Sequence, residues 1–185
     1  MVRRLTLAAL CFAFASVALA DAKDDKRKEI RATANETLTR LYKEQPKAKE
    51  AVEKAAGYAV FSNFGMKILF AGGGQGAGVA VDNKAKKETF MKMVEVQAGL
   101  GVGVKKFRLV WVFETQQKLD DFINKGWEMG AQATASAQYG KQGTQVYAGA
   151  LSVSPGVWLY QLTDDGLAVE LTAKGTKYYK DTELN

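Results

Sequence analysis

The glycines of residues 71–80, which read AGGGQGAGVA, are the residues whose spacing most resembles a chemical motif. Gly72, Gly74 and Ala77 match the GxGxxA pattern of loops that bind nucleotide phosphates. Such a loop needs a helix directly after it, because the helix N-terminus receives the phosphates. Here residues 79–83 (VAVDN) follow, and they are typical of a strand and a turn. The sequence also lacks a GxxxxGK[ST] motif, so it predicts that these glycines do not bind phosphate.

The spacing of the glycines instead indicates strands with one bare face. Alternate residues of a strand lie on the same face. The even positions from 72 to 78 are glycine, whereas Val79 and Val81 lie at odd positions. Residues 94–104 repeat this arrangement, with glycine at 99, 101 and 103 and apolar residues at even positions. A bare face permits the close approach of another backbone, or the bending that closes a sheet into a barrel.

Few residues of this chain are suited to catalysis. There is no histidine, which removes the commonest metal ligand, the usual general base near neutral pH and every Ser-His or Cys-His pair. No isolated pair of carboxylates stands out, although carboxylate chemistry is not excluded. We therefore predict no catalytic residue, no metal site and no cofactor, and we expect that the protein is not an enzyme.

Residues 1–20 have the pattern of a cleaved secretory signal. Arg3 and Arg4 precede an apolar run over residues 5–19, and Ala18-Leu19-Ala20 is a small-x-small cleavage sequence. The run is short for a membrane span. We expect export, with a periplasmic or cell-envelope location. Cys11, the single cysteine, would leave with the signal, so no disulfide is expected.

Helical periodicity precedes a long β-rich region. Residues 23–43 form an expected helix with an apolar stripe of Ile30, Ala34, Leu38 and Leu41, and a shorter helix runs from Pro46 to Ala55. One internal helix is expected over 115–126, between the N-cap Thr115 and Gly126. The expected strands are 58–61, 66–81, 89–104, 107–113, 132–139, 144–153, 157–162 and 167–172, with turns at 82–84, 155–156 and 164–166.

These elements predict an α+β fold that is mostly β. We expect a glycine-rich antiparallel sheet or barrel-like body, with N-terminal helices (21–56) and a β-rich region (57–185) forming one domain. The stripe of the first helix has two possible partners, the domain body or a lipid interface. The stripe is narrow and lacks Trp and Phe, which favours packing on the domain.

An ordered set of segments resembles the SYLF family, and in particular its bacterial branch. The segments are AGYAVF (56–61), the glycine-rich strand after it, QAGLGVG (97–103), residues 113–122 and KGTKYYKD (174–181). The resemblance implies a non-enzymatic lipid-binding module. Eukaryotic relatives bind phosphoinositides with help from an amphipathic N-terminal helix, and some bind actin. Bacterial members are mostly exported, and neither the phosphoinositide preference nor actin binding is carried over here.

Two basic clusters are candidate lipid-binding residues. Lys84, Lys86 and Lys87 occupy an expected turn, whereas Lys105, Lys106 and Arg108 lie at a strand junction. The register of the strands decides whether the clusters lie at the same end of the sheet or at opposite ends. The alternative for each cluster is an ordinary solvated loop. For Trp111, Trp127 and Trp158, core positions are expected rather than anchors in a lipid interface.

The net charge of +6 falls to +4 when Arg3 and Arg4 leave with the signal. This excess suits attraction to an anionic lipid or membrane surface, and ordinary solubility explains it equally well. The leading hypothesis is an exported protein that binds such surfaces. The alternative is a structural or protein-interaction module of the envelope, whose flat glycine face docks another chain. Nucleic acid is not an expected partner, and no oligomeric state is predicted.

Overall fold

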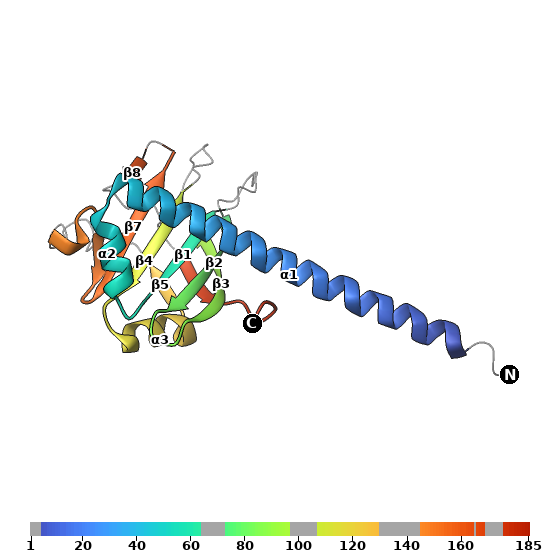
Figure 1. The fold of residues 1–185 in the computed structure, drawn as a ribbon. Helices are drawn as coiled ribbons and strands as arrows, with labels where there is room; N and C mark the ends of the chain where they lie inside the picture. The colour runs from blue at the N-terminus through green and yellow to red at the C-terminus, as the bar shows by residue number, and fades with distance from the viewer. Residues whose placement is uncertain (1–4, 64–72, 97–106, 130–144, 165, 169–175) are drawn as a thin grey trace.

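The computed structural model describes residues 5–63, 73–96, 107–129, 145–164, 166–168 and 176–185. Within them, a curled antiparallel sheet is crossed on one face by a long helix (Figure 1). The helices are α1 (Leu5–Glu44), α2 (Lys47–Lys54) and α3 (Gln116–Lys125), and a 3-10 turn η1 covers Gln145–Tyr147. The expected α+β class, mostly β, is confirmed.

Nine strands form the described sheet, in the order β5-β9-β3-β2-β1-β4-β7-β6, with β8 paired to β7. All pairs are antiparallel. The strands are β1 (Gly57–Asn63), β2 (Gly73–Asp82), β3 (Lys87–Val96), β4 (Arg108–Phe113), β5 (Trp127–Met129), β6 (Leu151–Ser154), β7 (Val157–Thr163), β8 (Gly166–Ala168) and β9 (Thr176–Lys180).

The two faces of the sheet carry separate hydrophobic clusters. We call the α3 side the inner face, and its cluster includes Phe61, Trp111 and Phe122. The outer face, under α1 and α2, includes Val110 and Tyr160. Strand β4 contributes alternate residues to both clusters, and its residues 109–113 are fully buried. This confirms the expected central strand, because only a strand covered on both faces is apolar throughout.

The apolar stripe of α1 packs on the outer face of the sheet. Ile30, Ala34, Leu38 and Leu41 are 4%, 6%, 9% and 0% exposed and belong to the outer cluster. The structure therefore places the stripe on the domain, the option that its composition favoured. The helix begins at Leu5, well before the expected residue 23, and its first turns project beyond the sheet (Figure 1). In the part of the chain that the structure describes, no helix is apolar over enough length to cross a bilayer.

The glycines of β2 have the architectural role that their parity predicts. Gly78 pairs with Phe61 of β1 on one side and with Met91 of β3 on the other. A Cβ atom on Gly76 would lie 2.7 Å from Met93 Cε and 2.7 Å from the Ser62 carbonyl oxygen. A turn and β3 follow β2, so the helix required of a phosphate-binding loop is absent at this place. The second glycine series, 97–103, lies outside the described residues.

The expected strand over 144–153 is wrong for its first half. Residues 145–147 form the 3-10 turn, and β6 begins only at Leu151. The Tyr147 ring stacks on Trp158 with centroids 4.5 Å apart, and Gly149 has a positive φ of 81°, which interrupts an extended chain. The expected strand 132–139 lies outside the described residues, and β5 and β9 are not among the expected strands.

Local signals for turns and caps are confirmed. The Thr115 hydroxyl accepts a hydrogen bond from the Lys118 backbone N–H, and Gly126, with φ of 74°, ends α3. Gly156 lies in the β6–β7 turn with φ of 75°. Thr163 pairs with Gly166 across the β7–β8 hairpin. Each of these features depends on neighbouring residues alone, which explains why the sequence predicts them.

Candidate functional site

The predicted lysine cluster lies together on the turn between β2 and β3. Lys84, Lys86 and Lys87 are all exposed. Asp82 shapes the turn, because its Oδ1 accepts hydrogen bonds from the backbone N–H groups of Lys84 at 2.9 Å and Ala85 at 2.7 Å. The Ala85 hydrogen bond is the largest of several causes that lower the pKa of Asp82 below its usual value. The turn therefore holds three cations on one fixed loop, which we call the lysine turn.

Arg108 lies at the other end of the sheet. In the pairing of β1 with its neighbours, Gly57 is opposite Asp82, whereas Ser62 is opposite Arg108. Arg108 Nη1 also contacts Glu36 Oε1 of α1 at 2.9 Å, so an acidic residue accompanies its charge. The structure does not bring Arg108 together with the lysine turn. Lys105 and Lys106 lie outside the described residues.

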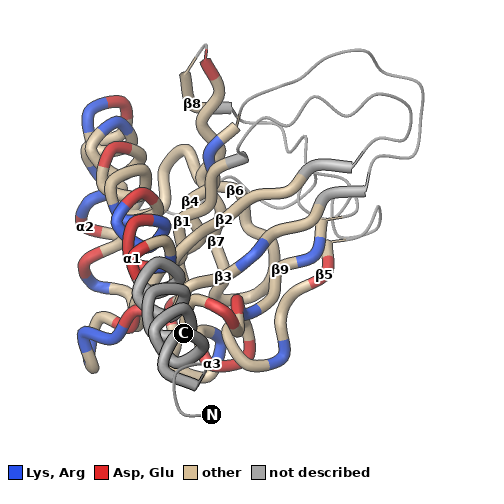
Figure 2. Tube along the Cα trace, turned by 90° about the vertical axis from the view of Figure 1, so that its right-hand side faces the viewer, with Lys and Arg blue, Asp and Glu red and all other residues tan. Residues whose placement is uncertain are grey.

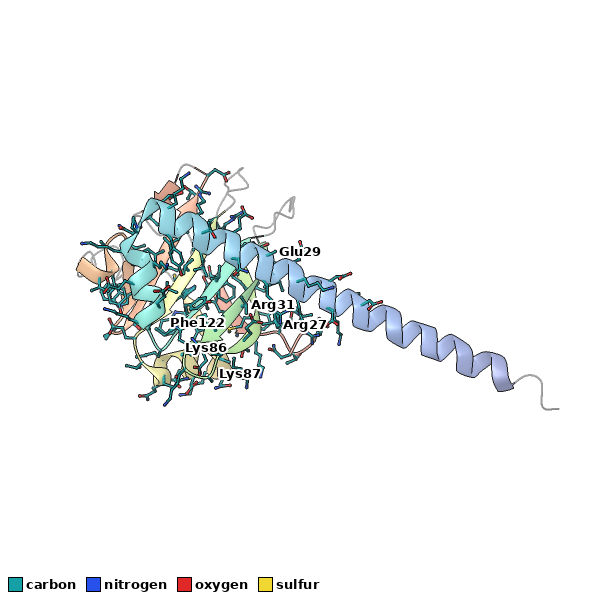
Figure 3. The ribbon with its side chains drawn as sticks, in the orientation of Figure 1. Arg27, Glu29, Arg31, Lys86, Lys87 and Phe122 are labelled. Atoms are coloured by element: carbon teal, nitrogen blue, oxygen red, sulfur yellow. The ribbon has the colours of Figure 1, made fainter. Side chains whose placement is uncertain are left out.

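A small groove lies beside the lysine turn, between α1 and the strand ends. Its volume is about 60 Å³, and its lining residues are Arg31, Ala34, Asn35, Leu38, Tyr58, Val79, Val81 and Glu88. Val81 pairs with Glu88, directly next to the pair of Asp82 and Lys87 that closes the turn. The groove therefore lies next to the lysine turn. Figure 3 labels Arg31 on α1 together with Lys86 and Lys87 of the lysine turn. We call it the Arg31 groove.

Arg31 and Glu88 form the charged part of the groove. Arg31 Nε donates a hydrogen bond to Glu88 Oε2 at 2.7 Å, and the guanidinium carbon lies 5.1 Å above the centre of the Phe90 ring. Both charged side chains remain partly open to solvent, at 44% and 36% exposure. Among the described residues, the two terminal amino groups of Arg31 and Glu88 Oε1 make no hydrogen bond. The pair is therefore positioned but retains donors and an acceptor for a ligand.

Residues 181–185 hold this part of α1 against β3. Arg27 Nε donates to the Leu184 carbonyl at 2.8 Å. The Asn185 side chain accepts from the Phe90 N–H at 2.9 Å and donates to the Phe90 carbonyl at 2.8 Å. Leu184 is buried in the outer cluster. These contacts fix the strand beneath Arg31, so residues 181–185 support the Arg31 groove without lining it.

Tyr58 adds a hydroxyl to the groove. Burial raises the pKa of the Tyr58 hydroxyl, and the nearby charge of Glu88 raises this pKa further. The hydroxyl is therefore neutral at physiological pH and is available to donate or accept a hydrogen bond.

This raised pKa predicts a loss of stability at high pH. The unfolded chain releases the Tyr58 proton near pH 10, before the folded chain does, so the free energy of unfolding falls as the pH rises from that value through the folded pKa. Urea unfolding measured between pH 9 and 12 should show a smaller decline for Tyr58→Phe than for the unaltered chain. The exposed Tyr179 supplies the control Tyr179→Phe. Equal declines for Tyr58→Phe and the unaltered chain would contradict the assignment.

Sequence reasoning found the lysine turn but missed Arg31, Asn35 and Tyr58. The turn signal is local, whereas the groove requires knowledge that α1 crosses β3. Trp111 lies in the inner cluster as expected, and Trp127 packs against it with ring centroids 6.0 Å apart. Among the described residues, no group of His, Cys, Asp and Glu side chains is arranged to hold a metal ion.

Comparison with known proteins identifies the family. The family model described as "Ysc84: Las17-binding protein actin regulator" matches residues 94–185. Beta cell expansion factor A of Aeromonas veronii is 35% identical over 160 residues, which is 86% of this chain and 59% of that relative. The chain belongs to the Ysc84/SYLF family. The resemblance stated from the sequence is thereby confirmed, and the Ysc84/SYLF family is one of binding modules rather than a known enzyme family.

Proposed function

We propose that this Ysc84/SYLF protein acts in the cell envelope and binds anionic membrane surfaces through the lysine turn. The observation that carries the proposal is that Lys84, Lys86 and Lys87 are exposed and are not paired with carboxylates. All three are exposed, and within the described part of the chain none forms an ion pair.

Many other lysines are accompanied by carboxylates, and Figure 2 shows basic and acidic residues interspersed along α1 and α2. The lysine pairs are Lys28 with Asp25, Lys49 with Glu53, Lys54 with Glu50, Lys92 with Asp181 and Glu183, Lys125 with Asp121, and Lys177 with Glu128. A cation near an anionic membrane contributes about 1 kcal/mol, so three cations on one turn support weak, salt-sensitive binding. The family-level role of a non-enzymatic binding module supports the same reading.

Vesicle sedimentation tests this proposal. Replacement of Lys84, Lys86 and Lys87 by Gln should lower binding to phosphatidylglycerol vesicles about a hundredfold at low salt, since about 1 kcal/mol is lost per lysine. The matched control replaces the exposed Lys43, Lys47 and Lys180 by Gln, which removes the same charge elsewhere. An equal loss in the control, or no association of the folded, unaltered protein with these vesicles, would contradict the proposal.

A protein partner in the envelope is the second candidate. The matched family is described as binding a protein, and Tyr179 is a large apolar side chain that is 36% exposed on β9. The glycine face of β2 is not the surface for such a partner at Gly76 and Gly78, because the Met93 and Phe61 side chains occupy the space next to them. Light scattering and capture from envelope extracts distinguish this candidate: a stable partner without vesicle binding would favour it.

A further inference from the structure

We propose that the Arg31 groove binds a zwitterionic group with a phosphate and a primary ammonium, the chemistry of a phosphoethanolamine headgroup. This inference names a ligand for the groove beside the lysine turn. For a headgroup within a membrane, the inference rests on the proposed function, because only a protein that reaches a membrane surface contacts such a headgroup. The ligand chemistry depends only on Arg31, Glu88 and Tyr58, and a soluble ligand tests it without a membrane.

The phosphate would be bound by Arg31. Its Nε already donates to Glu88, while its two terminal amino groups have no hydrogen-bond partner among the described residues. The Phe90 ring beneath the guanidinium restricts its position. A guanidinium that is held in place and presents N–H groups in one plane is well suited to a phosphate. The exposed lysine turn begins one residue pair away and adds positive charge near this end of the groove.

The ammonium would be bound by Glu88. Its Oε2 accepts from Arg31, and Oε1 has no hydrogen-bond partner in the described part of the chain. Tyr58 lines the same groove, and its side chain ends in a neutral hydroxyl that can accept a hydrogen bond. An ammonium carries three N–H donors, which can reach a carboxylate oxygen and a hydroxyl together.

The arrangement of charges favours a zwitterion over a simple anion. Arg31 and Glu88 already stand 2.7 Å apart between Nε and Oε2. A phosphate at Arg31 and an ammonium at Glu88 would make charges alternate around the site, so each charge has opposite charges beside it. A simple anion would gain Arg31 but would also meet the negative charge of Glu88.

The acceptor Glu88 Oε1, free among the described residues, favours a primary ammonium over a quaternary one. A trimethylammonium group is larger than a primary ammonium and has no N–H to donate to Glu88 Oε1. Phosphocholine is therefore the matched comparison ligand, since it keeps the phosphate and the linking carbons and changes only the nitrogen.

The soluble test uses O-phosphoethanolamine, phosphocholine and inorganic phosphate with the purified protein. Signals from the Asn35 side-chain amide and Arg31 Nε–H report binding in NMR titrations, because both residues line the groove. We expect phosphoethanolamine to bind about tenfold more tightly than phosphocholine. In Glu88→Gln this ratio should fall to about one, and inorganic phosphate should bind more tightly because the carboxylate charge is gone.

The control variant is Glu36→Gln, which alters a carboxylate paired with Arg108 at the opposite end of the sheet. It should keep the tenfold preference. Equal binding of phosphoethanolamine and phosphocholine to the unaltered protein would overturn the inference, as would a preference that survives in Glu88→Gln. Both variants change exposed side chains of nearly unchanged shape, and unfolding curves confirm that they fold.

Vesicles separate this inference from the proposed function. Phosphatidylglycerol vesicles are compared after addition of equal amounts of phosphatidylethanolamine or phosphatidylcholine. Stronger binding with phosphatidylethanolamine, lost in Glu88→Gln, supports the inference at a membrane. The inference is overturned if vesicle binding is the same with either added lipid and if phosphoethanolamine and phosphocholine bind equally. That result leaves the proposed function intact. A soluble preference without vesicle association supports the ligand chemistry and contradicts the proposed function.

Discussion

Replacing Gly78 by Val should destabilise the domain by about 3 kcal/mol or more, because overpacked cores typically lose 1–3 kcal/mol and here the backbone is also involved. A Cβ atom on Gly78 would collide with the Phe61 ring and with the Val60 carbonyl oxygen. A ring can rotate only into other side chains of the inner cluster, and the carbonyl belongs to the neighbouring strand. Such a loss is a large part of the 5–15 kcal/mol by which domains are usually stable.

Urea unfolding measures this effect, and Gln75→Val in the same strand is the matched control. Gln75 is exposed and lies at an odd position, on the opposite face from Gly78. Its replacement should change the free energy of unfolding by no more than about 0.5 kcal/mol, because a surface position tolerates a β-branched residue. In the double variant Gly78→Val/Phe61→Ala, the loss should be smaller than the sum of the two single losses, since the two side chains compete for one space. Similar stabilities for Gly78→Val and Gln75→Val would refute the bare-face interpretation.

The sequence predicted those features that depend on short spacings. The even glycines of β2, the buried stripe of α1 and the Thr115 cap were all readable because each repeats with the period of its own element or acts within one turn. The same reasoning found the lysine turn, whose residues are adjacent in the chain. It could not decide at which end of the sheet Arg108 lies, because that requires the pairing of β1 with both of its neighbours.

The remaining features depend on contacts between distant residues. Arg31 and Glu88 are 57 positions apart, and their pairing requires α1 to pack on the sheet so that Arg31 reaches β3. β9 pairs with β3, although the sequence of neither strand identifies the other as its pairing partner. The expected strand at 144–153 failed for a similar reason, because the stacking of Tyr147 on Trp158 overrides local β propensity. The periodicity of a sequence identifies the apolar face of a helix or strand, but it does not identify the element that packs on that face.

Leu41→Ala should lower the free energy of unfolding by about 3 kcal/mol, within the 2–5 kcal/mol usual for a buried leucine. Leu41 is 0% exposed and belongs to the outer cluster with Val110 and Tyr160. The removed methyl groups would leave a cavity between α1 and the sheet, because β4 and β7 cannot move toward the helix without breaking their pairing. The α1 helix is therefore a component of the folded domain and not a dispensable arm.

The same variant separates the two partners that the sequence left open for the α1 stripe. If the stripe packs on the domain, Leu41→Ala lowers the urea midpoint, and the folded fraction still binds phosphatidylglycerol vesicles through the lysine turn. If the stripe inserts into a lipid interface, vesicle binding falls while the urea midpoint stays unchanged. Lys43→Ala, an exposed position in the last turn of α1, is the control and should leave the midpoint unchanged within about 0.5 kcal/mol. Because Leu41 has no exposed surface, a lipid could reach it only after α1 had left the sheet, at the cost of the outer cluster.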